Sequence, residues 1–202
     1  MKKIFSLLIA FLPFNFLRIY LYNLLGGYNI SKNSKISFGC IIIAKQIKVE
    51  NSSLGIFNFI YTQKIQLENS NISNFNIIKN FSNLECVNNS LIGSYNKLIG
   101  ESLENGILKM NRAQFTTSHL IHINNKFILE KDVVFGGKNS LINIGITIKP
   151  TIIKDKVYFG SSIYLSSGIN IASEVLIGSG SIVRDSLNNQ GLFVSHRIRK
   201  VS

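Results

Sequence analysis

The sequence predicts an all-β solenoid, a parallel β-helix built from hexapeptide coils. The first observation is a series of residues spaced six apart, in which ten of the eleven members are bulky and apolar: Ile123, Leu129, Phe135, Leu141, Thr147, Ile153, Phe159, Leu165, Ile171, Ile177 and Val183. An α-helix selects a period of about 3.6 and an alternating strand a period of about two. A coil of short strands and tight corners selects six, because each face carries one inward side chain.

A second series with the same period lies upstream, with Lys48 and Gln66 as its polar exceptions: Ile30, Ile36, Ile42, Lys48, Leu54, Ile60, Gln66, Ile72, Ile78 and Leu84. The third observation is the similarity of Val49–Leu54 to Leu67–Ile72, which starts 18 residues later. Three hexads therefore make one triangular coil, and about seven coils stacked roughly 4.8 Å apart make a prism. An Ile-rich β-sandwich is the alternative, but its strands do not hold one register over so long a stretch.

Composition is consistent with one domain over residues 1–202, because 46% hydrophobic content supports a sizeable core. Abundant asparagine suits corners that need a positive φ. Residues 91–122 fall out of phase with both series, so we expect an extruded loop there. The expected division is a helical cap at 1–27, a first β-helix block at 28–90, an irregular segment at 91–122, regular coils at 123–188 and a basic tail at 189–202.

The N-terminal segment begins with two lysines and an apolar run, as a secretory signal does. No small-residue cleavage pattern follows, and Pro13, Asn15 and Arg18 interrupt the run before it reaches the length of a membrane span. We expect one short helix from about residue 14 to 25, ended by Gly26-Gly27, that covers the open end of the solenoid. Peripheral contact with a membrane surface is a further expectation, through Ile4, Leu7, Leu8 and Phe11.

The formal net charge of +12 favours an anionic partner such as a cofactor, a glycan or a membrane surface. No recognisable nucleic-acid-binding module is present in the sequence, so we expect no DNA or RNA partner. The two cysteines, Cys40 and Cys86, are too few for a disulfide framework and are expected as buried free thiols. A cytoplasmic location follows, with association with the inner face of the inner membrane as an extension of it.

The segment Thr116-Thr-Ser-His119-Leu-Ile-His122 holds two of the three histidines and lies in the expected loop. Loops on a rigid scaffold often carry functional groups. An imidazole with an ordinary pKa near 6.5 is suited to take a proton from a hydroxyl at neutral pH. The alternative is a histidine whose hydrogen bonds are satisfied within the loop.

The chain presents, in order, a helix, hexapeptide coils, Thr116-Thr-Ser-His119, Gly136-Gly137, Phe159-Gly160-Ser161 and Ile177-Gly178-Ser179-Gly180-Ser181-Ile182-Val183. This order resembles the left-handed β-helix acetyltransferases over nearly the whole chain, and within them the branch that O-acetylates sugars of capsules and other bacterial surface glycans. The resemblance implies left-handed coils, a homotrimer and an active site between neighbouring subunits.

The same resemblance implies direct acetyl transfer from acetyl-CoA to a sugar hydroxyl, with His119 as the general base. Ser118, His122 and Asn143 would then contact the acceptor sugar. We expect no metal, because the zinc chemistry of the carbonic-anhydrase-like branch needs three histidine ligands at a spacing that this chain does not have. Cysteine nucleophilic catalysis is not expected either, because both cysteines lie in the first-half coils.

For the cofactor, the resemblance implies that the pantetheine arm runs along a groove between adjacent coils, at Gly160 and Ser161 in one coil and Gly178 and Ser179 in the next. Plain corner geometry is the other explanation of these small residues. The candidates for the nucleotide phosphates are Arg184, Arg197, Arg199 and Lys200.

Two departures leave other functions open. The Trp-Thr-His-Gly run of the sugar-acetylating relatives is replaced by Leu141-Ile-Asn143-Ile-Gly145, and their terminal Asn-Pro-Ala-Lys element by Phe193-Val-Ser-His196-Arg197. The alternatives are a non-catalytic hexapeptide scaffold and an N-acetyltransferase of an amino sugar nucleotide.

Overall fold

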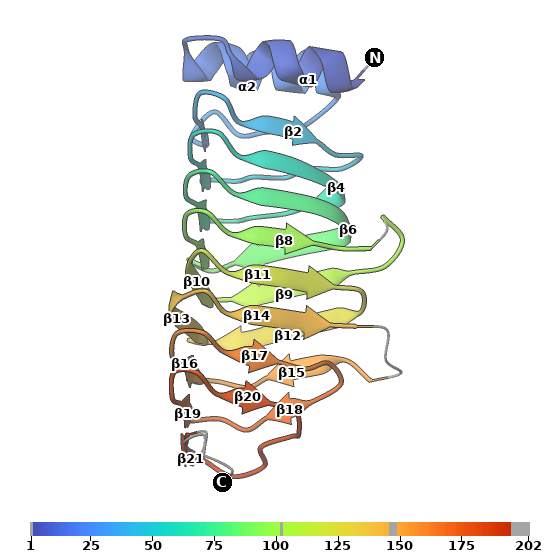
Figure 1. Ribbon diagram of the computed structural model, residues 1–202. Helices are drawn as coiled ribbons and strands as arrows, with labels where there is room; N and C mark the ends of the chain where they lie inside the picture. The colour runs from blue at the N-terminus through green and yellow to red at the C-terminus, as the bar shows by residue number, and fades with distance from the viewer. Residues whose placement is uncertain (1, 102, 146–148, 195–202) are drawn as a thin grey trace, which may run out of the picture.

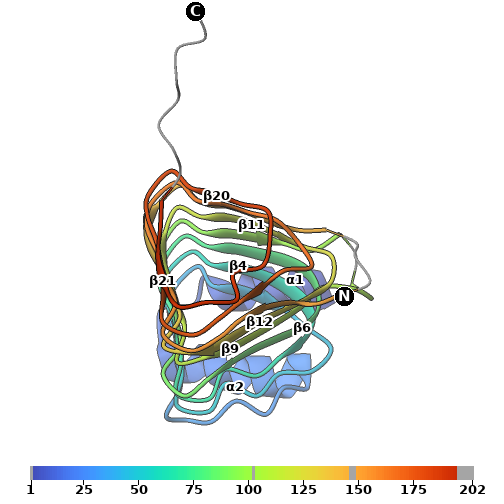
Figure 2. The ribbon, with the colours of Figure 1, turned by 90° about the horizontal axis from the view of Figure 1, so that it is seen from below.

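The computed structural model describes residues 2–101, 103–145 and 149–194. Two helices lie across one end of a stack of about eight coils, and each coil lies next to the one before it along the axis (Figure 1). Along the axis the coils superpose into a three-sided outline (Figure 2). The parallel β-solenoid predicted from the period of six is confirmed.

The strands lie on three faces, and neighbouring coils pair in parallel, as Lys35 does with Ser53 and Ser53 with Asn71. The first face is a nine-stranded sheet of β1 (Lys35–Ile36), β3 (Ser53–Leu54), β5 (Asn71–Ile72), β7 (Leu91–Ile92), β10 (Gln114–Thr117), β13 (Val134–Lys138), β16 (Tyr158–Phe159), β19 (Val175–Ile177) and β21 (Gly191–Phe193). The second face holds β2 (Ile41–Ile43), β4 (Phe59–Ile65), β6 (Ile77–Val87), β8 (Lys97–Ile99), β11 (Leu120–Ile123), β14 (Leu141–Ile144), β17 (Tyr164–Leu165) and β20 (Ile182–Val183). The third face holds β9 (Ile107–Asn111), β12 (Lys126–Lys131), β15 (Thr151–Ile153) and β18 (Asn170–Ile171). The long strand β6 pairs with β8 on the second face and with β9 on the third, so these two faces form one 12-stranded sheet.

The core consists of inward side chains from all three faces, with two from strands such as β11, β12 and β14, and aromatic rings stack in it along the axis. The rings of Phe115 and Phe135 lie 5.0 Å apart, and those of Phe135 and Phe159 lie 4.1 Å apart and nearly parallel. These residues are 20 and 24 residues apart in the sequence, and the parallel pairing of successive strands places them on one line.

The period of six is less strict in the molecule than in the predicted series. Lys48 and Gln66 are not the inward residues of their coils; their neighbours Val49 and Leu67 are fully buried instead, with φ angles of 55° and 73°. At these two corners the inward position is therefore shifted by one residue, from Lys48 to Val49 and from Gln66 to Leu67. Leu141 is likewise exposed, and Ile142 and Ile144 are the inward residues of β14. Thr147 lies outside the described residues.

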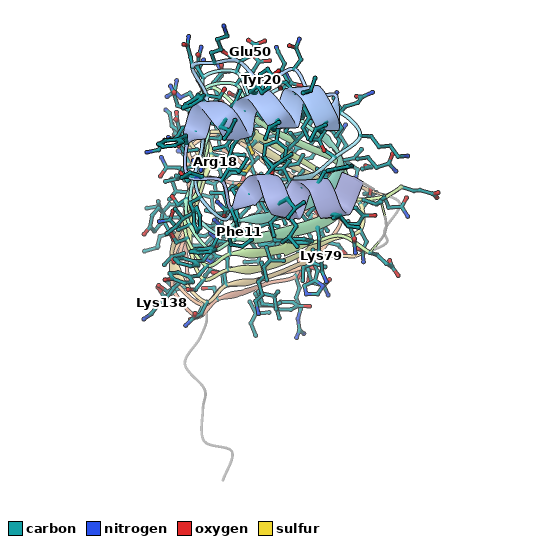
Figure 3. All side chains as sticks on the ribbon, turned by 90° about the horizontal axis from the view of Figure 1, so that it is seen from above. Phe11, Arg18, Tyr20, Glu50, Lys79 and Lys138 are labelled. Atoms are coloured by element: carbon teal, nitrogen blue, oxygen red, sulfur yellow. The ribbon has the colours of Figure 1, made fainter. Side chains whose placement is uncertain are left out.

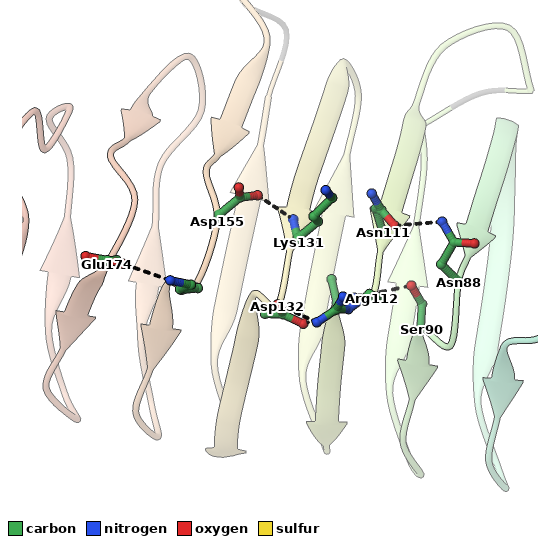
Figure 4. A network of polar contacts seen from close by, with 10 residues as sticks. Asn88, Ser90, Asn111, Arg112, Lys131, Asp132, Asp155 and Glu174 are labelled. Atoms are coloured by element: carbon green, nitrogen blue, oxygen red, sulfur yellow. Dashed lines mark hydrogen bonds and ion pairs between the residues drawn. The ribbon is translucent and has the colours of Figure 1, made fainter.

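The corner before the first face has a left-handed residue in successive coils, with φ between 47° and 66°: Asn51, Asn69, Asn89, Arg112, Asp132, Lys156 and Glu174. Asparagine is among the residues with a Cβ that adopt this conformation most readily, and the first three of these corner residues are asparagines. The later coils carry charges of alternating sign there. Arg112 forms a two-point ion pair with Asp132 at 3.0 and 2.8 Å, and Lys156 binds Glu174 at 2.9 Å (Figure 4).

Residues 91–122 do not form one irregular segment, because most of them lie in the coils. This segment contributes five strands, β7 to β11, to all three faces. Its phase differs because the coils are longer: Leu91 pairs with Gln114, so 23 residues rather than 18 separate successive strands. The additional residues fall in the corner between β8 and β9, and the strands on either side keep their inward side chains.

The single helix predicted from residue 14 to 25 is α2 (Asn15–Gly26), and a second helix, α1 (Lys2–Ala10), precedes it. Pro13 lies between the two. Gly27 ends α2 in the left-handed conformation with φ 69°, which glycine adopts without a Cβ penalty. Among the described residues, neither helix is long and apolar enough to cross a membrane.

Candidate active site

His119 belongs to a column of buried corner residues that precede the second face. Its members in successive coils are Cys40, Asn58, Asn76, Asn96, His119, Ser140, Ile163 and Ser181. The Oδ1 of Asn58 accepts the backbone N–H of Asn76 at 2.9 Å, and the Oδ1 of Asn76 accepts that of Asn96 at 2.8 Å. Each side chain therefore satisfies a buried backbone donor of the next coil.

His119 continues this ladder. Its own N–H donates to Asn96 Oδ1 at 2.9 Å, and its Nδ1 accepts the N–H of Ser140 at 3.3 Å. Ser140 Oγ in turn accepts the N–H of Ile163 at 3.2 Å. The imidazole of His119 thus accepts a backbone N–H of the next coil, as the carboxamides of Asn58 and Asn76 do.

The other ring nitrogen of His119 also has a partner. Its Nε2 lies 3.1 Å from Thr116 Oγ1, and that hydroxyl donates to the carbonyl of Phe135 at 2.9 Å. Because Nδ1 accepts the Ser140 amide, the neutral ring carries its proton on Nε2 and donates it to Thr116. Its only lone pair is therefore in use, and no nitrogen remains to receive a proton from a hydroxyl.

Burial also makes His119 a weak base. Only 1% of the residue is exposed, and the ring lies against those of Phe115 and Phe135, with centroids 6.3 and 6.5 Å away. Burial lowers the pKa of His119 to about 4, because the charged form loses its hydration. His119 therefore matches the second interpretation of the sequence, a histidine whose hydrogen bonds are all satisfied within the fold. Its expected role as a base stays a prediction that this geometry does not support.

His122 and Asn143 are brought together on the outer surface of the second face. They are paired residues of the parallel strands β11 and β14, so their Cα atoms lie about 4.8 Å apart and their side chains point the same way. His122 is half-buried and Asn143 is exposed. Ile142 pairs with Leu165, and Leu165 pairs with Val183, so the residues that follow them, Asn143, Ser166 and the exposed Arg184, form one outward-facing column. Three of the predicted site residues therefore share one outward column.

Ser118 lies at the corner beside this face, half-buried and with φ 58°. Its N–H donates to the carbonyl of Ser94 at 3.1 Å. Although Ser118 directly precedes His119 in the chain, it belongs to the outer corner and not to the buried column.

Gly160 and Gly178 are stacked in neighbouring coils, as their spacing of 18 residues predicts, because Phe159 pairs with Ile177. Ser161 N–H donates to Ser179 Oγ at 3.0 Å. A Cβ on Gly160 would lie 2.5 Å from Ser179 Oγ and 2.7 Å from its backbone nitrogen. The contact between the coils is thus sufficient to require glycine there, and a role of these residues in cofactor binding stays a prediction.

A groove of about 200 Å³ lies at the C-terminal end of the coils, and Arg184 lines it together with Ile182, Asp185, Phe193 and Val194. The guanidinium of Arg184 is the one predicted phosphate ligand that lies within the described residues. Arg197, Arg199 and Lys200 lie outside them, as does His196.

A second groove, of about 410 Å³, lies on the third face and was not foreseen from the sequence. Lys109, Glu130, Lys131 and Asp155 line it, and Lys109 pairs with the lining residue Glu85 at 3.1 Å. The sequence signal for it is weak, because β9 carries one charged residue, Lys109, and β12 carries Lys126, Glu130 and Lys131, as any solvent-facing strand can.

Within the described residues, no three histidine, cysteine, aspartate or glutamate side chains gather closely enough to hold a metal ion. Cys40 and Cys86 are buried free thiols, as predicted. Comparisons of the chain with protein-family models and with curated protein sequences find no match.

Proposed function

We propose that this chain is an acetyl-CoA-dependent O-acetyltransferase that modifies a hydroxyl of a bacterial surface glycan, with His122 in place of His119 as the general base. The fold is compatible with this activity, and the motif order supplies the resemblance to that family. The observation that carries the proposal is the pairing of His122 with Asn143 on the solvent-facing side of β11 and β14. An imidazole there can meet a sugar hydroxyl, which the buried imidazole of His119 cannot.

The chemistry assigned to these residues is a direct transfer. Acetyl-CoA supplies an activated thioester. His122 takes the proton of the sugar hydroxyl as its oxygen bonds to the carbonyl carbon, and the imidazolium returns that proton to the thiolate released when the C–S bond breaks. Asn143 orients the acceptor through its carboxamide, and the Arg184 guanidinium binds phosphate in the same outward column. The homotrimer implied by the resemblance would place a second subunit against this face.

A non-catalytic scaffold is the second candidate function. The saturated hydrogen bonding of His119 and the direct contact of Ser161 with Ser179 support it, because both predicted functional elements have a structural explanation. A scaffold needs the stack of coils, to which His119 contributes its hydrogen bond with Ser140, and it needs no reactive histidine.

Coenzyme A release from acetyl-CoA, measured with a panel of hexoses and N-acetylhexosamines, tests the proposal. His122→Ala should lower the rate about 100-fold or more, the usual contribution of a general base. The matched variant is His119→Asn, which places in the column the residue that three preceding coils carry there, and it should keep at least half of the rate. A His122→Ala protein as active as wild type would overturn the assignment of the base. A folded wild type that neither binds coenzyme A in calorimetry nor releases it from acetyl-CoA would favour the scaffold.

A further inference from the structure

The two helices of the cap bury polar groups beside apolar ones such as Ile9 and Ile19, and they expose an apolar stripe on the opposite side. On α1 the inward residues include Ser6, and on α2 they include Arg18 and Tyr22, all buried. The exposed positions are apolar and recur with helical spacing: Ile4, Leu7, Leu8 and Phe11 from α1 onwards, and Phe16, Tyr20 and Leu24 on α2. A surface helix of a water-soluble domain normally points such a stripe at the core.

The inward polar groups are explained by the strand edge that they cover. The first coil has no preceding coil to pair with its backbone groups, and an open edge needs partners. Arg18 Nε donates to the carbonyl of Ile36 at 2.8 Å, and Tyr22 OH donates to that of Cys40 at 2.9 Å. Asn23 both donates to the carbonyl of Ile30 and accepts its N–H, at 3.0 and 2.8 Å.

The outward apolar groups remain exposed among the residues that the structure describes. α1 and α2 lie side by side across the end of the solenoid, so their outer surfaces face the same way (Figure 3). Leu8 is 64% exposed and Leu24 is 61% exposed. The helices lie across the end of the solenoid (Figure 1), and their exposed apolar residues therefore form a surface over that end.

The charge of the residues near the cap distinguishes which partner covers this surface. Seven basic residues precede the first acidic residue of the chain, Glu50: Lys2, Lys3, Arg18, Lys32, Lys35, Lys45 and Lys48. Lys32, Lys35 and Lys45 belong to the coil directly beneath the helices. A second copy of the chain would bring the same positive charge to this surface and be repelled, whereas an anionic lipid surface would be attracted.

A groove beside α2 combines apolar side chains with a positive charge. Its volume is about 550 Å³, and Phe16, Leu17, Ile19 and Tyr20 line it together with Lys32. An apolar channel with one ammonium at its border fits a lipid acyl chain with its phosphate, and it lies on the same helix as the exposed stripe.

We propose that the outer surface of the helical cap lies in the headgroup layer of a membrane that contains anionic lipids. The apolar residues enter the boundary between headgroups and acyl chains, and the lysines of the first coil lie over the lipid phosphates. The solenoid then stands away from the membrane, with its faces and its C-terminal groove open to the aqueous side. This inference does not depend on the proposed acetyltransferase activity.

Flotation of the full chain with lipid vesicles tests it. Vesicles of phosphatidylcholine and phosphatidylglycerol should bind the chain, and raising the salt concentration should weaken that binding. The double variant Leu8→Gln with Leu24→Gln should lower the partition coefficient about tenfold or more. The matched control is the double variant Ile182→Gln with Leu192→Gln. It removes two aliphatic side chains, 58% and 68% exposed, at the C-terminal end of the solenoid, and it should change the partition coefficient less than twofold.

A second measurement uses the absence of tryptophan from the sequence. Leu24→Trp adds a single tryptophan to the cap, whose emission, excited selectively at a wavelength that tyrosine does not absorb, should shift to shorter wavelength with the anionic vesicles and be quenched by brominated lipids. Equal flotation of wild type and the cap variant would overturn the proposal. So would a wild type that never floats and whose oligomer dissociates on the cap substitutions, because the surface would then join copies of the chain.

Discussion

The Nδ1 atom of His119 accepts the backbone N–H of Ser140, one coil further along the solenoid, at 3.3 Å. The same position in the three preceding coils is occupied by Asn58, Asn76 and Asn96. An imidazole nitrogen and a carboxamide oxygen are thus used here for one purpose, the satisfaction of a buried amide between coils.

This equivalence predicts how substitutions of His119 change stability. His119→Asn should change the free energy of unfolding by about 1 kcal/mol or less, because a carboxamide still accepts the Ser140 amide. His119→Leu keeps the volume but leaves that amide buried without a partner, and it should cost about 1–3 kcal/mol. Urea unfolding of both variants measures the difference. Equal losses would mean that the hydrogen bond to Ser140 contributes nothing.

Stability should fall between about pH 6.5 and pH 4 because of His119. Its folded pKa of about 4 lies below that of a free imidazole, so in this range the unfolded chain binds a proton that the folded chain does not. The stabilisation is complete above pH 6.5 and is lost as the pH falls towards 4, by at most about 3 kcal/mol at roughly 1.4 kcal/mol per pKa unit.

The control for this pH dependence is His119→Asn, in which every carboxylate titrates as in wild type. Subtracting its urea unfolding energies from those of wild type isolates the imidazole. A difference that stays constant from pH 7 to pH 4.5 would contradict the lowered pKa.

Tyr22 should determine how firmly the cap is held. Tyr22 OH donates to the carbonyl of Cys40 at 2.9 Å and lies 3.3 Å from the N–H of Ile42, which donates to it. Tyr22→Phe leaves both backbone groups of the first coil without this partner and should cost about 1–3 kcal/mol. Hydrogen exchange at the Ile42 amide should accelerate while exchange in the distant β14 is unchanged. Unchanged exchange at Ile42 would show that water replaces the phenol without loss.

Both cysteines should be inert in the native protein. Burial raises the pKa of the Cys40 and Cys86 thiols to about 12, so almost no reactive thiolate is present near neutral pH. A disulfide-exchange reagent should label neither residue in buffer and both in denaturant. Stoichiometric labelling of one thiol under native conditions would contradict this burial.

The exposed ion pair between Arg112 and Asp132 should contribute little to the free energy of unfolding. Asp132→Asn removes the two-point contact with Arg112, and asparagine retains the left-handed backbone that Asp132 adopts at φ 61°. The expected loss is below about 1 kcal/mol and should vanish in high salt, because both side chains are solvent-exposed. A larger, salt-independent loss would show that the pair supports the corner in another way.

The period of six predicted the solenoid and most of its inward residues because one side chain per face must fill the lumen whatever the rest of the coil does. It misplaced residues 91–122, since a longer corner between β8 and β9 shifts the phase without removing the strands. It also misplaced Lys48 and Gln66, where a left-handed residue lets Val49 and Leu67 turn inward. The length and the conformation of a corner are difficult to predict from the positions of apolar residues in the sequence.

Spacing along the chain is enough to predict the stacked coils, the helical cap and the alignment of Gly160 with Gly178. Which histidine is accessible to solvent depends instead on how the coil folds in three dimensions. The positions of His119 and His122 differ by three residues, and only the placement of the corner between β10 and β11 directs the first into the buried ladder and the second outward beside Asn143. The structure alone also revealed that the cap points its polar groups at the first coil, because an unpaired strand edge demands hydrogen bonds that apolar side chains cannot supply.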